Sequence, residues 1–368
     1  MGEEDLTTIH IAQNVNHALM RRVAGAMVRP VSRLHHLRTL AERVLACYDL
    51  HGASLTLVSE TANAIFHVTV PSGRPQRLVE TGMTRDGAAY ALRLRPPGWH
   101  RTQPMAEELQ WLLALRRDTD LVVPEPVPAC DGTLIQDINA PGTSEPWQGV
   151  LFHWVAGERR TETLTPPDLE RVGTCMARLH QHAAAFVTAY HPPLTRRARF
   201  CDVLAWRHGF PPAVAVYTPH DLAVFAVAAQ WVQTACQAVE EIAHSVGFIH
   251  ADMHQWNYLF HDGDVRAIDF DDCGWGYYIY DMAVTLTDID DRDDYVALRH
   301  AFLTGYTRIQ PLPPGYETSI TPLSAARILF MLEWLLGRAH PEPWAWGEAY
   351  MRNAVGRLER LLAEAPLP

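Results

Sequence analysis

The hydrophobic pattern of this 368-residue chain changes in kind at about Gly157. Before that point, short runs rich in β-branched and aromatic residues predict strands, with one helical stretch at 104–117 between the third and the fourth. After it, apolar residues recur at helical spacing over long stretches. The pattern predicts an α+β chain of two lobes, a small one with a five-stranded antiparallel sheet and a larger, mainly helical one. The strands are expected at 55–59, 65–70, 88–94, 133–139 and 149–154.

The same pattern divides the chain into three segments. Residues 1–50 are rich in Ala, Leu, Val and Arg with roughly helical spacing and are expected to form an N-terminal helical extension. Residues 51–156 then form the small N-terminal lobe, and residues 157–368 form the C-terminal lobe. In that lobe, helices are expected at 167–185, 219–246, 293–309, 322–336 and near 344–363, with short strands at 258–260 and 265–270.

Composition narrows the classes of partner. The chain has 31 basic and 42 acidic residues and a formal charge of −11, which argues against a broad nucleic-acid-binding face and against adhesion to anionic membranes. A neutral or cationic small substrate is easier to accommodate. The six cysteines lack C-x-x-C pairing, so they predict neither a zinc site nor a disulfide framework. We read them as reduced thiols and expect a cytoplasmic protein.

The strongest chemical signal is the segment from His250 to Asp272. It reads H-x-D-x-x-x-x-N, and an apolar residue, Asp and Phe follow about a dozen residues later. We interpret it as a hairpin with Asp252 and Asn257 on its entry loop and Asp269 at its exit. Phosphoryl transfer requires a carboxylate facing the acceptor hydroxyl and oxygen ligands that hold Mg²⁺ against the phosphates of ATP. One hairpin of this kind supplies all three groups.

This pattern resembles the aminoglycoside phosphotransferase and choline kinase superfamily, and particularly its bacterial branch of homoserine-kinase-like and stress-response-kinase-like members. The resemblance implies a bilobal protein-kinase-like fold that uses ATP and Mg²⁺. It implies that Asp252 is the catalytic base or orients the acceptor, and that Asn257 and Asp269 ligate Mg²⁺. His250 is expected to brace the catalytic loop, as is Asp281, which lies in a Tyr-Asp-Met-Ala stretch similar to a Tyr-Asp-Leu-Ala-like element of the family.

The resemblance extends upstream to a strand and a helix of the small lobe. Arg93, in the strand Tyr-Ala-Leu-Arg-Leu, stands where most kinases place a lysine that grips the phosphates, and Glu108 stands where a helix carboxylate orients that cation. An arginine in this position replaces a compact ammonium with a planar fork. Taken alone, Glu108 would be read as an exposed helix residue or an intrahelical partner.

Two further small-lobe segments are expected to contact the nucleotide. The stretch 149–157, with Phe152 and Trp154, resembles the family's hinge, whose backbone groups read adenine. The loop 60–64 lacks the glycines of a protein-kinase nucleotide loop. Phosphate contacts there are expected from backbone amides and from Thr61 and Asn63.

The acceptor is less well specified by the sequence. Trp256 stands where relatives usually have glycine, so it is expected to narrow the site or to form a wall of the acceptor pocket. The acidic run 288–294, after Asp271 and Asp272, is either a solvated face or a group of carboxylates near the acceptor that attracts an amine. The second reading favours an amino alcohol, an aminoglycoside or a homoserine-like amino acid.

Three functions remain open at this point. The first is a small-molecule kinase acting on an alcohol that carries an amine. The second is a bacterial Ser/Thr protein kinase of the stress-response type, which shares the site but needs an open groove. The third is a nucleotide-binding regulator that has lost catalysis. The sequence does not specify the oligomeric state or the role of residues 1–50.

Overall fold

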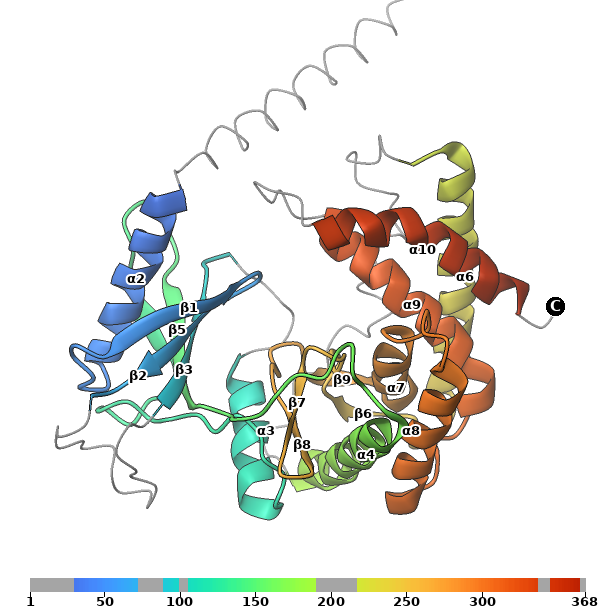
Figure 1. The fold of residues 1–368 in the computed structure, drawn as a ribbon, viewed down its shortest axis with the longest axis horizontal. Coiled ribbons are helices and arrows are strands. Elements are labelled where there is room, and N and C mark those ends of the chain that lie inside the picture. Colours follow the sequence, from blue (N-terminus) through green and yellow to red (C-terminus); the bar gives the residue numbers. More distant parts are fainter. Residues whose placement is uncertain (1–29, 72–88, 99–104, 190–216, 337–344, 365–368) are drawn as a thin grey trace, which may run out of the picture.

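The computed structural model describes residues 30–71, 89–98, 105–189, 217–336 and 345–364, and it has the expected two-lobed α+β architecture (Figure 1). The sheet-containing lobe and the helical lobe lie side by side, with helix α3 (Met105–Asp118) between them. Of the expected N-terminal extension, residues 1–29 lie outside the described residues.

The small lobe contains the predicted five-stranded sheet, and every neighbouring pair in it is antiparallel. The fourth strand is shorter than the predicted 133–139. The Asp131 carboxylate accepts hydrogen bonds from the backbone N–H and the hydroxyl of Thr133, and this turn delays the strand until Gln136. In the order β1-β2-β3-β5-β4, the strands are β1 (Ser54–Glu60), β2 (Ala64–Thr69), β3 (Ala89–Arg95), β5 (Trp147–His153) and β4 (Gln136–Ile138).

Helix α2 (Pro30–Ala46) packs on one face of this sheet. Its buried residues recur at helical spacing and share one hydrophobic cluster with buried strand residues such as Phe66 and Leu92. Gly149 of β5 lies directly beneath the helix, because a Cβ placed there would come within 2.5 Å of a methyl carbon of Val44. Residues 30–46 therefore belong to the small lobe.

Helix α3 joins the small lobe to the core of the large one. Trp111 is fully buried, and its ring makes edge contacts with Phe248 and Phe270, at centroid distances of 5.0 and 5.5 Å. Its indole N–H donates to Nδ1 of His182 on helix α4 (Pro166–Ala189) over 3.2 Å. Because this anchor lies one turn beyond Glu108, it fixes that carboxylate relative to the catalytic segment.

The large lobe is mainly helical, as expected, but some of its element boundaries differ from prediction and three elements were not predicted. The helix predicted to reach residue 246 ends at Glu240, where the hydroxyl of Ser245 donates to the carbonyls of Val239 and Ile242 and turns the chain into a strand. Pro322, taken for a helix start, lies inside α9. Helix α7 and strands β6 and β9 were missed. The elements are α4 (Pro166–Ala189), α6 (Pro219–Glu240), β6 (Val246–Ile249), β7 (Tyr258–His261), β8 (Asp264–Ala267), β9 (Gly274–Tyr277), α7 (Tyr278–Thr287), α8 (Tyr295–Ile309), α9 (Tyr316–Leu336) and α10 (Ala345–Ala363).

Helices α6 and α9 are long and apolar enough to cross a membrane by length and composition alone. In this fold they pack against each other, and α9 also packs against α7. Helix α9 carries the buried cation Arg327 toward the catalytic segment. Both helices are thus used as core helices of the large lobe.

Helices α4 and α8 cross closely at two glycines. A Cβ at Gly173 would clash with the backbone carbonyl of Phe302, and one at Gly305 would clash with the carbonyl of Glu170.

Backbone atoms cannot move aside as a side chain can, so we expect Gly173→Ala to lower the free energy of unfolding by about 1–3 kcal/mol. Urea denaturation measures this change. The matched control is Val296→Ala on exposed α8 surface, and equal stability of both variants would contradict the prediction.

Candidate active site

A cavity of about 1400 Å³ opens between the two lobes. Its walls are the β1–β2 loop, strands β3 and β5, the catalytic hairpin, and helices α9 and α10. All the residues predicted to act in catalysis, metal binding or nucleotide binding line this cavity, whereas His250 and Asp281 lie behind it. The small lobe contributes Thr61, Asn63, Arg93, Glu108, Phe152 and Trp154, and the large lobe contributes Asp252, Asn257 and Asp269.

The catalytic loop is held from behind by one buried carboxylate. Asp281, at the start of α7, accepts the backbone N–H of His250 over 3.0 Å and that of Ala251 over 2.8 Å. Ala251 has φ +68°, a left-handed conformation that is unfavourable for a residue with a Cβ. The two charge-assisted hydrogen bonds offset this cost and set the direction in which the next residue, Asp252, leaves the backbone.

Asp281 is itself oriented by a chain of polar side chains that sequence reasoning missed. His180 of α4 lies 2.9 Å from Asp281 through Nε2 and 2.9 Å from the Tyr306 hydroxyl through Nδ1. Because the carboxylate can only accept, Nε2 donates to it and Nδ1 accepts from the tyrosine. Gln310 in turn donates to that hydroxyl over 2.8 Å. The only hint in the sequence was a histidine on the apolar face of a helix.

His250 connects the entry and exit of the hairpin. Its Nε2 lies 3.1 Å from the carbonyl of Ile268, and its Nδ1 accepts the backbone N–H of Asp252 over 3.3 Å. This pattern requires the neutral imidazole with the proton on Nε2. Burial, which outweighs the neighbouring carboxylates, lowers the pKa of His250 and keeps the ring neutral. Its ring also contacts Phe270, at a centroid distance of 4.4 Å.

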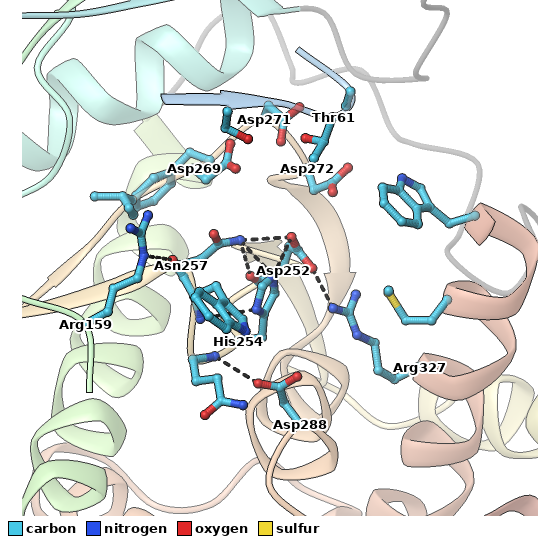
Figure 2. A pocket seen from close by; sticks show the side chains of 18 of the residues that line it. Thr61, Arg159, Asp252, His254, Asn257, Asp269, Asp271, Asp272, Asp288 and Arg327 are labelled. Atoms are coloured by element: carbon cyan, nitrogen blue, oxygen red, sulfur yellow. Dashed lines mark hydrogen bonds and ion pairs between the residues drawn. The ribbon is translucent and has the colours of Figure 1, made fainter. Parts of the chain in front are cut away.

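The Asp252 carboxylate is held on both sides (Figure 2). One oxygen lies 2.8 Å from a guanidinium nitrogen of Arg327, and the other accepts the Asn257 amide over 2.9 Å and lies 3.4 Å from His254. Burial by itself would raise the pKa of Asp252, but His254 and Arg327 outweigh it and hold that pKa well below its usual range. Asp252 is therefore ionised at neutral pH.

Sequence reasoning also missed Arg327. It is about 5% exposed and lies on α9, 75 residues beyond its partner, so no local motif linked the two. Burial opposes the charge of its guanidinium, yet Asp252 keeps the pKa of Arg327 above its usual value. Its Nη1 is buried without a hydrogen-bond partner.

Two oxygen-bearing side chains, those of Asn257 and Asp269, could hold a divalent cation. The Asn257 amide nitrogen donates to the backbone carbonyl and the carboxylate of Asp252, which turns its oxygen away from that residue (Figure 2). Enclosure in the cleft and the adjacent carboxylate of Asp271 raise the pKa of Asp269 well above its usual value. A bound cation would relieve this repulsion, so the residues fit Mg²⁺.

Among the described residues there is no cluster of three or more His, Cys, Asp or Glu side chains arranged to hold a metal. A magnesium site does not require such a cluster. Mg²⁺ usually binds one or two protein oxygens and takes its remaining ligands from water and substrate phosphates.

Arg93 and Glu108 form a buried, bidentate ion pair. The two guanidinium–carboxylate distances are 2.8 and 2.7 Å, and the pair lies over the Phe152 ring, whose centroid is 5.1 Å from the guanidinium carbon. Burial disfavours the charge of Arg93, but Glu108 keeps the pKa of Arg93 above its usual value. The planar fork of arginine thus matches the carboxylate with two parallel hydrogen bonds, which a lysine could not do.

The β1–β2 loop and the end of β5 enclose the small-lobe side of the cavity. The Asn63 amide donates to Asp271 over 2.8 Å, so this loop contacts the segment that follows the hairpin, and Thr61 lies beside it in the cavity lining. The backbone N–H groups of His153 and Trp154 donate to other small-lobe carbonyls. The Trp154 side chain remains 40% exposed toward the cavity.

The chain resembles known proteins in sequence and in overall fold. Residues 69–317 match the phosphotransferase enzyme family, which is more than half of the chain. The chain belongs to this family. It is a kinase, an enzyme that transfers phosphate to a hydroxyl group, and the aminoglycoside phosphotransferase resemblance seen in the sequence is confirmed.

Individual proteins are similar to this chain in sequence or in fold. Stress response kinase A of Escherichia coli (strain K12) is 26% identical over 291 residues, which is 74% of this chain and 81% of that protein. A solved microcompartment-associated aminopropanol kinase has a TM-score of 0.69 at 26% identity, covering 88% of this chain and 97% of that one. An amicoumacin kinase in complex with AMP-PNP, Ca²⁺ and amicoumacin shares the fold, with a TM-score of 0.68 at 18% identity over 93% of this chain and 98% of that one.

In this phosphotransferase, part of the acidic run 288–294 lines the cavity and part of it does not. Asp288, Asp290 and Asp291 line the cavity, and their place near the acceptor stays a prediction. Asp290 pairs with Arg357 of α10 over 2.9 Å, and Asp288 accepts the backbone N–H of Gln255 over 3.2 Å. One of the three carboxylates is therefore neutralised by a cation.

Trp256 and the adjacent aspartates were named without definite roles, and the structure places all of them at the cavity. The Trp256 side chain is 53% exposed there, and its carbonyl accepts a hydrogen bond from Arg159 over 3.2 Å. Asp271 and Asp272 lie beside Asp269 (Figure 2). Trp256 thus lines the cavity, and its place in the acceptor pocket stays a prediction.

We expect Asp281→Ala to destabilise the protein strongly. The change leaves two backbone N–H groups, those of His250 and Ala251, buried without their acceptor, and it removes the partner of His180. The free energy of unfolding should fall by about 3–5 kcal/mol, as measured by urea denaturation. Removal of the exposed carboxylate in Glu162→Ala is the control and should cost less than about 0.5 kcal/mol. A loss equal to that of the control would disprove the bracing role.

His250 should make stability depend on pH. Its pKa is lower in the folded than in the unfolded protein, so the unfolded chain binds the proton first as the pH drops below about 6.5. Stability should then fall with decreasing pH, with His250 contributing up to about 1.4 kcal/mol per pH unit. His250→Gln should flatten this slope in denaturation curves between pH 8 and 5.5, whereas His35→Gln at an exposed site should not. Identical slopes for the two variants would refute the assignment.

Proposed function

We propose that this enzyme transfers the γ-phosphate of ATP to a hydroxyl of a small, amine-bearing molecule. The observation that carries the proposal is the convergence of Asp252, Asn257 and Asp269 on one cleft, opposite the Arg93–Glu108 pair. These are the groups that phosphoryl transfer needs: an acceptor-orienting carboxylate, oxygen ligands for Mg²⁺, and a cation for the phosphates.

Asp252 would act by orientation more than by basicity. Arg327 and His254 keep it ionised, so it accepts the hydrogen bond of the acceptor hydroxyl and directs that oxygen at the phosphorus. A carboxylate with so low a pKa is a weak base, which suits a loose transition state in which the proton leaves late.

Asn257 and Asp269 would hold the metal, and Arg93, fixed by Glu108, would contact the phosphates. Mg²⁺, when bound, neutralises the charge that develops on the phosphate oxygens. Thr61, Asn63 and the end of β5 would contact the remainder of the nucleotide.

The preference for an amine rests on the acceptor side of the cleft. Asp288 and Asp291 line it, and aromatic side chains such as Trp256 and Trp334 face the same space. Carboxylates and aromatic faces both favour an ammonium group. The similarity to an aminopropanol kinase supports the same class of acceptor.

A protein kinase is the second candidate, because curated relatives bear the name stress response kinase A. A protein substrate would need an open groove beside Asp252. Here helices α9 and α10 line the acceptor side of the cavity, which supports a small acceptor. A regulator without catalysis is disfavoured because Asp252, Asn257 and Asp269 all lie in one site.

Replacing Asp252 should separate catalysis from nucleotide binding. In Asp252→Ala, ADP release with an accepted amino alcohol should fall by about 10²–10⁴-fold, because orientation of the hydroxyl matters only in the transition state. ATP affinity, measured by calorimetry, should change by less than about threefold. Asp293→Ala, an exposed carboxylate outside the cavity, is the control. Turnover near the wild-type value would disprove the assigned role.

Asp269→Ala should impair binding of the nucleotide itself, in contrast to Asp252→Ala. Loss of this oxygen ligand should weaken binding of Mg-ATP itself by at least about tenfold, while binding of ATP in EDTA should change little. A Mg-ATP titration unaltered by the substitution would remove Asp269 from the metal site.

ADP release from a panel of amino alcohols, amino acids, aminoglycosides and generic proteins, run in parallel, distinguishes the small-molecule kinase from the protein kinase.

A further inference from the structure

Helix α10 presents one polar face to the acceptor side of the cavity. Arg352, Asn353, Gly356 and Arg360 line the cavity at positions i, i+1, i+4 and i+8, so they lie on the same side of the helix. Buried residues such as Leu358 occupy the other side and pack into the core. The polar face lies in the part of the cavity that α9 and Asp252 also line.

Gly356 is not explained by packing within the protein. A glycine inside a helix costs about 0.5–1 kcal/mol relative to alanine, and α10 extends well beyond it on both sides. Two glycines of other helices, Gly173 and Gly305, are required by the close approach of two backbones. A Cβ at Gly356 would meet no atom of the described residues within 4 Å. The bare backbone at this point leaves room for something that enters the cavity.

The side chains one turn away on either side of Gly356 are cationic. Arg352 is 67% exposed at the side chain, and its contact with Glu348 is a loose one of 3.7 Å. Arg360 donates over 3.4 Å to the carbonyl of Gly356. Arg357, by contrast, is engaged with Asp290 and with the carbonyl of Thr287, which fixes α10 beside the catalytic segment. Arg352 and Arg360 thus flank the bare backbone with donors that can turn toward a ligand.

Two polar atoms of the cavity-lining residues are buried without a hydrogen-bond partner among the described residues. They are Nη1 of Arg327 and the hydroxyl of Thr287, both on side chains more than nine-tenths buried, and the Arg327 side chain lies close to the Tyr280 hydroxyl. Both residues line the cavity. Buried polar atoms without partners are rare in folded proteins and call for an explanation such as a bound ligand.

We propose that the acceptor is amphoteric: besides its hydroxyl and its amine it carries an anionic group, a carboxylate or a phosphate, which lies over Gly356 between Arg352 and Arg360. Asp291, which lines the same cavity, then faces the ammonium. This inference rests on the proposed function and adds to it a binding subsite for an anion. Planar arginine forks are well suited to carboxylates and phosphates.

Matched acceptors test the subsite directly. Threonine has the structure of aminopropanol with an added carboxylate on the carbon that bears the amine, and threonine methyl ester removes the negative charge again. If a carboxylate is bound, kcat/KM from ADP release should be at least tenfold higher for threonine than for either compound that lacks the anion. Glycerol phosphate compared with glycerol is the corresponding phosphate pair. Equal kcat/KM within both pairs would overturn the proposal while leaving the kinase activity intact.

The arginines are tested with the double variant Arg352→Gln/Arg360→Gln. The KM of the preferred anionic acceptor should rise at least tenfold. The kcat, the KM of ATP and the catalytic efficiency with aminopropanol should all stay within about twofold of wild type. Arg308→Gln, at a distant exposed arginine, is the matched control. An equal loss with acceptors that carry the anion and acceptors that lack it would overturn the subsite.

Gly356→Ala separates a ligand role from a purely structural one. The methyl group should raise the midpoint of thermal unfolding by about 1–3 °C through helix propensity, and it should raise the KM of the anionic acceptor at least fivefold. A stabilised variant with unchanged KM would overturn the proposal.

The failure of the proposed function would look different from the failure of the subsite. If no acceptor in the panel releases ADP, the amine-bearing small-molecule assignment fails. Calorimetric titration of threonine and glycerol phosphate into the Mg-ADP complex then decides the subsite. Binding to wild type that the double variant loses supports it, and the absence of binding to wild type overturns it.

Discussion

The active site depends on one buried carboxylate. Asp281 accepts two backbone N–H groups of the catalytic loop and holds Ala251 in a left-handed conformation that would otherwise be unfavourable. Its orientation comes from His180 and, through it, from Tyr306 of α8. Three helices, α4, α7 and α8, therefore determine where Asp252 points. Because these helices also form the core of the large lobe, the position of the catalytic carboxylate is tied to the folding of that lobe.

Two buried ion pairs give the cleft its electrostatic character. The pair of Asp252 with Arg327 and the pair of Arg93 with Glu108 bring charges out of water at a cost that mutual attraction only partly offsets. These ion pairs matter because of where they hold their charged groups. Each fixes a charged group that faces the cavity, and each joins two elements that are remote in sequence. The cleft thus holds its charges in place before substrates enter, which is the arrangement that stabilises a phosphoryl transition state most economically.

On the side of the cavity lined by α10, the net charge depends on which aspartates are paired with arginines. The aspartates after α7 would by themselves form a strongly acidic surface. Arg357 neutralises one of them and in doing so brings α10 to the cavity, and α10 adds Arg352 and Arg360. The result is a cavity wall of mixed charge, which is the basis of the proposal that the acceptor carries groups of both signs.

The sequence by itself determined the local chemistry: the five strands, most of the helices, and the motif that contains Asp252, Asn257 and Asp269. These features follow from short-range periodicity and from fixed spacing within one hairpin. Even the partnership of Arg93 and Glu108 could be expected, through the resemblance of this strand and helix to those that carry such a pair in kinases. Only the tertiary structure decided the roles of His180 and Arg327, the pairing of Asp290 with Arg357, and the place of α2 on the sheet. Each of these depends on contacts between helices far apart in the chain, and a periodic pattern shows which face of a helix is buried but not what it is buried against.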